Sequence, residues 1–295
     1  MKKVFAFLIL SAALLTSCDY VDVPQQAAQV ASANDTVRKV LIEDFTGHTC
    51  IYCPDGARII DSLESVFPGH IVPMAIHAGF FAEPCPPHAL PSGAPAGSFS
   101  EDFRVPLEDA EFDNIFAISS WPNPTGFVNR YGGYPTPPQT PTAASAWPDT
   151  AAVILADSIS AYIKIHPSYN SSSRILGLTV TGILYDTLVG TYDVAVYLTE
   201  DNLHGYQLDH IIPVTGIDTN YTFNHVFRGC VNNPGHINGV QVLSGTSNRG
   251  TLINYSMVTP FTVSNTFNAA NCHLVAILYD AATYRIVQAD MVSLM

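Results

Sequence analysis

Positive charge is scarce in this sequence. Lysine and arginine together supply 12 of the 295 residues, against 25 aspartates and glutamates, so the formal net charge is -13. Such a surface repels the phosphate backbone of nucleic acids, because proteins that bind nucleic acids neutralise phosphates with clustered basic side chains. The composition therefore argues against a nucleic-acid partner.

Common catalytic signatures are also absent. The sequence contains no Gly-x-Ser-x-Gly, no Gly-rich phosphate loop and no His-Glu-x-x-His, which are the motifs of serine hydrolases, nucleotide-binding enzymes and zinc proteases. Nothing points to a cofactor, and none is expected. After the first residues no apolar run approaches the roughly 20 residues that a transmembrane helix needs, so a water-soluble body is expected.

The N-terminus has the order of a lipoprotein signal peptide. Lys2 and Lys3 precede an apolar run from Val4 to Leu15, and Leu15-Thr16-Ser17-Cys18 follows. Cleavage before Cys18 would leave an acylated cysteine that anchors the protein in a membrane; an ordinary secretory signal with Cys18 present by chance is the alternative. Removing residues 1–17 takes away two lysines and no acid, so the charge of -13 becomes -15. Residues 18–36 show no periodicity and are predicted to be a flexible tether.

Two cysteines stand at redox spacing between an apolar run and a helical pattern. Val40-Leu41-Ile42 is typical of a buried strand, Cys50 and Cys53 follow, and Pro54 suits the first turn of a helix. Near a helix N-terminus the dipole and free N–H groups stabilise a thiolate, so the pKa of about 8.5 typical of cysteine falls to roughly 3.5 to 7.5 in Cys-x-x-Cys motifs. Cys50 is predicted to be the attacking sulfur and Cys53 the resolving one. An inert disulfide is the alternative.

The segment from Val40 to the helix resembles the active-site segment of thioredoxin-like proteins, and Asn123-Pro124-Thr125-Gly126 resembles their cis-proline loop. The resemblance implies that Pro124 is a cis-proline facing the cysteines and that Asp44 is a buried carboxylate that moves a proton to and from Cys53. The sequence departs from the pattern at Thr49, where an aromatic residue is usual, and at Ile51-Tyr52, where Gly-Pro is usual. A long insertion also separates the second strand from Pro124.

Over its mature length the chain resembles the outer-membrane protein twenty-eight family. Three segments carry the resemblance: Ile42 to Pro54, Tyr221 to Gly229, and Leu274 to Asp280 with Val287-Gln288-Ala289. Membership implies an outer-membrane lipoprotein, displayed on the cell surface or the periplasmic face, with a thioredoxin-like domain followed by a β-rich domain. It also implies a role in binding or adhesion, with host or envelope proteins or glycans as partners.

The expected fold is therefore α/β plus all-β. Residues 37–160 are predicted to form a thioredoxin-like domain with an insertion at 79–118, ending in a helix from Thr150 to about Ser160 that Asp149 caps. Residues 161–295 contain short runs rich in Val, Ile, Thr and Tyr between Asn, Gly and Asp turns, which predict a β-sandwich resembling a jelly roll.

The remaining cysteines can be counted in pairs. With Cys18 lipidated and Cys50 paired with Cys53, Cys230 and Cys272 could form a structural disulfide, leaving Cys85 alone. A zinc or copper(I) site is a rival use of the sulfurs. Its ligands would come from Cys50, Cys53, Cys85 and His88, with His48 and His77 close by resemblance. The redox spacing and an oxidising compartment favour the disulfide, so no metal is expected, and His77 is predicted to be buried and hydrogen-bonded.

Other polar and aromatic residues have a structural and a functional interpretation. His225 and Arg228, with Asp209 and His210 nearby, lack a nucleophile motif and are predicted to be structural. Aromatic residues near Pro-rich loops could form a binding platform, but core packing is the favoured use. These residues are Trp121, Tyr131, Tyr134 and Trp147.

Two functions remain open. The chain could be a binding protein that uses the thioredoxin-like domain as a scaffold, or a lipid-anchored thiol-disulfide oxidoreductase. The observation that separates them is whether the insertion leaves Cys50 open to a protein substrate or covers it.

Overall fold

The computed structural model describes residues 37–131 and 140–295. The predicted signal peptide (1–17), Cys18, the tether and Tyr134 lie outside these ranges. The first part of the chain alternates strands with helices. Its elements are β1 (Val40–Thr46), α1 (Cys53–Val66), β2 (Ile71–His77), η1 (Phe80–Ala82), α2 (Pro106–Phe116), η2 (Ile118–Ser120), β3 (Thr125–Val128), β4 (Thr142–Ala143), η3 (Ala144–Ala146) and α3 (Trp147–Ala156).

The rest of the described chain is built from strands and one short 3-10 helix. The elements are β5 (Ala161–Asn170), β6 (Ile175–Leu184), β7 (Leu188–Val189), β8 (Tyr192–Glu200), β9 (Leu203–Leu208), β10 (Ile217–Phe223), β11 (Val226–Cys230), β12 (Val240–Leu243), β13 (Thr246–Ser247), β14 (Leu252–Ser256), β15 (Phe261–Thr262), η4 (Ala269–Asn271), β16 (Cys272–Asp280) and β17 (Ile286–Ser293). The chain thus combines an α/β part with a β-rich part, as the sequence predicts.

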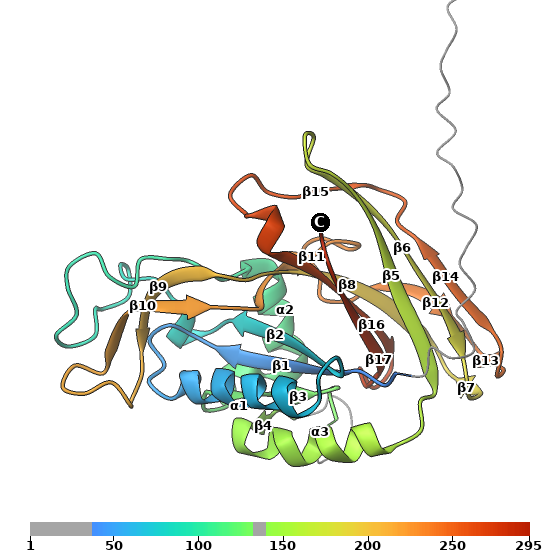
Figure 1. The fold of residues 1–295 in the computed structure, drawn as a ribbon, viewed down its shortest axis with the longest axis horizontal. Coiled ribbons are helices and arrows are strands. Elements are labelled where there is room, and N and C mark those ends of the chain that lie inside the picture. Colours follow the sequence, from blue (N-terminus) through green and yellow to red (C-terminus); the bar gives the residue numbers. More distant parts are fainter. Residues whose placement is uncertain (1–36, 132–139) are drawn as a thin grey trace, which may run out of the picture.

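One sheet runs through both parts (Figure 1). Its strand order is β17-β16-β8-β11-β2-β1-β3-β4, with β12 also paired to β8. β1 lies parallel to β2 and antiparallel to β3, and β11 joins β2 through Val226 and Ala75. β1 is buried along its whole length, as is typical of a strand covered on both faces. The sheet contains strands from both sides of residue 160. The division of the chain into two domains at that residue stays a prediction.

Alternation along β1 sends its side chains to two different cores. Val40 and Ile42 pack against α1 and α3, whereas Leu41 and Phe45 pack against Phe112 of α2. Farther along, strands β5 and β6 form a second sheet with β14 and β15, and their apolar side chains pack against β8 and β16. Asp44 belongs to the same set as Val40 and Ile42 by alternation, so its carboxylate faces α1.

The terminal helix starts earlier than expected. α3 begins at Trp147, with Pro148 in its first turn, so Asp149 lies in that turn and does not cap the helix. Proline suits this position because its missing N–H would have no partner within the helix. Trp147 is fully buried against β1 and β3 side chains, which confirms a packing role for this aromatic residue, whereas Trp121 and Tyr131 are partly exposed.

Candidate functional site

Cys50 and Cys53 occupy the connection from β1 to α1. Their sulfurs lie at disulfide distance with the Cα atoms 5.4 Å apart, so the predicted pair is present. Cys53 is the first residue of α1, and Pro54 follows it in the first turn. The pair therefore lies where the free N–H groups of the helix can stabilise negative charge on sulfur after reduction.

Both cysteines are covered. Cys50 is 3% and Cys53 2% exposed, although Tyr52 between them is 56% exposed. Part of the cover is η1 of the insertion, where the Phe81 carbonyl oxygen accepts hydrogen bonds from the backbone N–H and the hydroxyl of Thr49. Gly47 allows this approach, since a Cβ there would lie 2.3 Å from the carbonyl carbon of Phe81.

The other part of the cover is the β9–β10 hairpin, a two-stranded sheet of its own. Gln207 donates from its side-chain amide to the carbonyl oxygen of Cys50 at 3.0 Å, and the backbone N–H of His210 donates to Ile51. No pattern in the sequence identifies Gln207, because it lies 157 positions from Cys50.

Ion pairs connect the loop after β9 to α1. Arg58 of α1 pairs with Asp209 at 2.8 Å, and His210 pairs with Asp55 at 3.0 Å. Burial would raise the pKa of Asp55, but hydrogen bonds from Arg58 and His210 outweigh it, so this pKa is lowered. Asp209 and His210 thus help to close the site.

Asp44 lies behind the disulfide. Its side chain is buried, and its Oδ1 atom has no hydrogen-bond partner among the described residues. Gly56 of α1 makes room for it, since a Cβ at that position would lie 3.1 Å from Oδ2. Burial raises the pKa of Asp44 to about 8, because a carboxylate loses hydration in an apolar interior.

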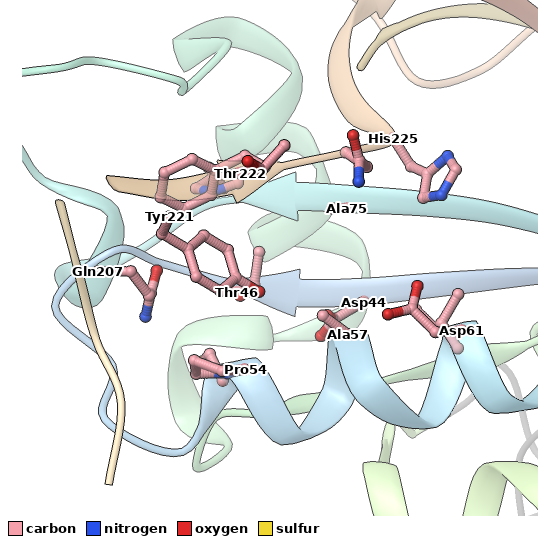
Figure 2. Close-up of a pocket in the computed structure, with 15 residues that line it drawn as sticks. Asp44, Thr46, Pro54, Ala57, Asp61, Ala75, Gln207, Tyr221, Thr222 and His225 are labelled. Atoms are coloured by element: carbon pink, nitrogen blue, oxygen red, sulfur yellow. The ribbon is translucent and has the colours of Figure 1, made fainter. Parts of the chain in front are cut away.

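Asp44 and Cys53 line one cavity of about 80 Å³ between β1, α1 and β10. Figure 2 shows its labelled residues on these elements, on β2 and β9, and, for His225, in the turn between β10 and β11. His77 also lines the cavity, and burial, together with the nearby cations of His48 and Arg228, lowers its pKa to about 3. Its burial was expected, but the expected hydrogen bond was wrong: neither ring nitrogen has a partner within the described chain, since aromatic rings of Phe103 and Phe223 surround it.

Pro124 precedes β3 and carries the expected cis peptide bond with Asn123. Its Cβ lies 3.3 Å from the position that a Gly56 Cβ would occupy, so the loop packs on α1. Pro124 and Tyr52 line an open cleft of about 670 Å³ that also borders Arg58. The sequence thus identified residues that meet around the first turns of α1.

The predicted disulfide between Cys230 and Cys272 is wrong, because both residues are buried free cysteines, as is Cys85. β8 separates β11 from β16, so the two backbones are about 9.5 Å apart at two strand spacings, whereas bridged Cα atoms lie roughly 4.4 to 6.8 Å apart. Their side chains also enter different cores: Cys230 packs beside Phe227, and Cys272 packs beside Leu274.

The rival metal site does not form. Within residues 37–131 and 140–295, no group of three or more His, Cys, Asp or Glu side chains is placed to hold a metal ion. Cys50 and Cys53 are bonded to each other. His48 instead makes a hydrogen bond with the carbonyl oxygen of Glu83, and His88 lies 3.4 Å from the Glu83 carboxylate.

His225 and Arg228 have the structural roles expected of them. Arg228 pairs with buried Glu200 on β8 at 2.9 Å. His225 lies 3.3 Å from Asp201 and 3.8 Å from Glu64 of α1, so it connects the β-rich part with the helix. None of the helices in the described parts of the chain is long and apolar enough to cross a membrane.

Comparisons with known proteins place the chain in a family. The profile of the family described as Outer membrane protein Omp28 matches residues 110–293, more than half of the 295 residues. The match includes Pro124 and the β9–β10 hairpin but begins after Cys50 and Cys53. No curated protein matches the chain.

Two solved structures extend the comparison. HBP35 of Porphyromonas gingivalis is 16% identical with a TM-score of 0.60, over 88% of this chain and 76% of that one, which is a likeness of fold. A domain of the outer membrane lipoprotein Omp28 from Porphyromonas gingivalis is 20% identical with a TM-score of 0.27, over 46% of this chain and 88% of that one. From the family match, the chain belongs to the Omp28 family and is an outer membrane protein.

Proposed function

We propose that this protein is a lipid-anchored binding protein of the outer membrane, in which a thioredoxin-like domain (37–160) serves as a scaffold beside a β-sandwich domain (161–295). The order of strand, Cys-x-x-Cys helix, strand, cis-proline, strand and terminal helix supports the thioredoxin-like assignment. The anchor would be the lipid on Cys18.

The covering of Cys50 is the observation that carries the proposal. Both sides of the disulfide loop are closed, by η1 and by the β9–β10 hairpin, and Cys50 has 3% exposure. A protein disulfide cannot reach a sulfur so covered unless the hairpin moves. In this state the disulfide fixes the loop that the two covering segments contact.

Exposed apolar side chains lie close together where the disulfide loop meets the loop after β9. Ile51 and Tyr52 project from the disulfide loop, and Ile211 and Val214 from the loop after β9. The two loops are in contact, because His210 donates to the Ile51 carbonyl and the Tyr52 and His210 rings lie 5.1 Å apart. We call Ile51, Tyr52, Ile211 and Val214 the tip patch. Clustered apolar exposure of this kind marks protein-interaction sites.

A matched pair of substitutions tests the tip patch. Val214 and Val258 are both fully exposed, but Val258 lies in the β-rich part between β14 and β15. A photo-crosslinking residue at each position, in the protein expressed at the outer membrane, should give a discrete crosslinked partner from position 214 only. Val214→Asp and Ile211→Asp should abolish binding of that partner, and Val258→Asp should not. Equal products from both positions would contradict the proposal.

Asp44 favours thiol-disulfide exchange as a second candidate function. A buried carboxyl group with an unpartnered oxygen, such as Oδ1 of Asp44, is costly, and a structural disulfide has no need of one beside Cys53. In exchange, a thiol reductant would first open the Cys50–Cys53 disulfide, and the Cys50 thiolate would then attack a substrate disulfide and release one substrate thiolate. Cys53 would lose its proton to the Asp44 carboxylate and displace the second substrate sulfur, which re-forms the Cys50–Cys53 disulfide and leaves the substrate reduced. This requires the β9–β10 hairpin to open.

The reduction potential separates the two candidates. A potential above about -230 mV, with a Cys50 pKa near or below neutral after reduction, is in the range of exchange catalysts. A potential below about -300 mV would identify the pair as a structural disulfide. Cys50→Ser supplies the control for signals that come from the other cysteines.

A further inference from the structure

A second cleft lies at the far end of β1 from the disulfide. Its volume is about 480 Å³, and it lies between the start of β1, the α3–β5 connection and the β16–β17 turn (Figure 1). β1 has seven residues, which span about 23 Å at 3.3 Å each, so the cleft is separate from the tip patch. Its size is in the range of pockets that hold small molecules, roughly 300 to 1,000 Å³.

Two of the few basic residues of this chain line the cleft. Arg38 and Arg285 both border it, in a protein with 12 basic and 25 acidic residues. Arg130 and Arg228 pair with the carboxylates of Glu43 and Glu200, and half-buried Arg174 donates to the backbone carbonyl oxygens of Val263 and Phe267. Neither Arg38 nor Arg285 forms an ion pair with a carboxylate of the described chain.

The guanidinium groups are held in place but keep free donors. Arg38 donates through Nη1 to the Ser158 carbonyl oxygen at 2.5 Å, whereas its buried Nε–H has no acceptor among the described residues. Arg285 is exposed, and its guanidinium lies 4.3 Å above the Tyr131 ring. Burial lowers the pKa of Arg38, and the nearby Asp157 carboxylate raises it. Arg285 also lowers this pKa, because the two cations repel each other.

The rest of the lining suits a polar ligand with a small apolar part. Ser160 and Thr283 bring hydroxyl groups, and Leu188 and Ile286 supply an apolar wall. Two carboxylates are also present. Asp280 uses Oδ1 to accept the backbone N–H groups of Ala282 and Thr283 in its own turn, and Asp157 makes no ion pair with either arginine.

We propose that this cleft is a binding site for a phosphate-bearing ligand, held between Arg38 and Arg285 with the hydroxyls of Ser160 and Thr283. A phosphate offers several acceptor oxygens that share its negative charge, so two guanidiniums can bind it together. It would also relieve the repulsion between the two cations. The phosphate could be free or belong to a lipid headgroup, since Arg38 follows the predicted tether directly.

Titration of the oxidised protein, residues 19–295, with inorganic phosphate and glycerol 1-phosphate tests this site. Saturable binding should weaken by about tenfold or more in Arg285→Gln and in Arg38→Gln, since hydrogen bonds to charged groups are at stake. Arg249→Gln makes the same charge change at an exposed turn between β13 and β14 and should bind like the wild type. Arg38→Gln also loses the bond to Ser158, so if it fails to fold, Arg285→Gln decides.

Flotation with vesicles identifies the source of the phosphate. Retention of the wild type on vesicles of phosphatidylethanolamine with phosphatidylglycerol, with loss of retention in Arg285→Gln but not in Arg249→Gln, would assign the site to headgroups. Binding of the soluble probes without retention would assign it to free phosphates. If neither the probes nor the vesicles bind, or if Arg249→Gln weakens binding as much as Arg285→Gln, the proposal is overturned.

Discussion

The side-chain amide of Gln207 donates a hydrogen bond to the carbonyl oxygen of Cys50, 3.0 Å away. The same amide also reaches the carbonyl oxygens of Gly47 and Leu208. One buried side chain therefore joins the β9–β10 hairpin to the disulfide loop.

Gln207→Ala should open this cover. The carbonyl groups would lose a buried donor, which costs about 1 to 3 kcal/mol of unfolding free energy, and Cys50 should become more accessible. We expect dithiothreitol to reduce the Cys50–Cys53 disulfide several times faster than in the wild type. Gln241→Ala on β12, where the glutamine is exposed, is the control. An unchanged reduction rate in Gln207→Ala would show that the hairpin does not protect the disulfide.

Asp44→Asn should change stability in a pH-dependent way. The folded pKa of about 8 lies above the unfolded value of about 3.9, so between these values the folded state holds a proton that the unfolded state has lost. Wild-type stability therefore falls as the pH rises from about 4 to about 8, by up to about 6 kcal/mol at 1.36 kcal/mol per pH unit. Asn carries no such proton.

The measurement is urea unfolding of the oxidised proteins at pH 5 and at pH 8.5. Asp44→Asn should be more stable than the wild type by several kcal/mol at the higher pH and much closer to it at the lower. Asp61→Asn changes an exposed carboxylate at the border of the same cavity and should keep the wild-type profile. A difference between Asp44→Asn and wild type that does not vary with pH would contradict the raised pKa.

Cys85, Cys230 and Cys272 should be free thiols in the folded protein. If the mature protein is denatured without reductant and treated with iodoacetamide, Cys85, Cys230 and Cys272 should all be alkylated, because none is bonded to another cysteine. Cys50 and Cys53 should react only after reduction. Peptide mass spectrometry measures the alkylation of each cysteine. If Cys230 and Cys272 were both unmodified before reduction, the disulfide between them would be present after all.

The sequence predicted the part of the site that is local along the chain. Cys50, Cys53 and Pro54 belong to one continuous motif, and resemblance supplied Asp44 and Pro124. The cover was not predictable, because Gln207 and Asp209 meet the disulfide loop and α1 from more than 150 residues away. No pattern of spacing encodes such a contact.

The prediction of a disulfide between Cys230 and Cys272 was wrong for the same reason: contacts between distant residues depend on the fold and not on spacing along the chain. Counting cysteines in pairs ignores the face of the sheet on which each side chain lies, and this depends on strand order and register. A shift of one residue reverses the face. The burial of both residues follows from their apolar neighbours, but their separation by β8 required the structure.

A buried ion pair of the α/β part contacts tyrosines of the β-rich part. Arg130 follows β3 and contacts Glu43 of β1 at 2.6 Å, with both side chains fully buried and the Tyr197 hydroxyl of β8 at 3.4 Å. The guanidinium also lies near the Phe116 and Tyr279 rings. Aromatic rings and one carboxylate thus replace the hydration that Arg130 loses.

Glu43→Gln should therefore be strongly destabilising. It leaves the Arg130 charge buried without its partner, which typically costs 3 to 5 kcal/mol. Urea unfolding should show this loss, while Asp102→Asn, which breaks a partly exposed pair with Arg104, should cost less than about 1 kcal/mol. The double substitution of Glu43→Leu with Arg130→Met removes both charges and should cost less than Glu43→Gln alone. If the double variant is the less stable of the two, the pair contributes net stability and the desolvation argument fails.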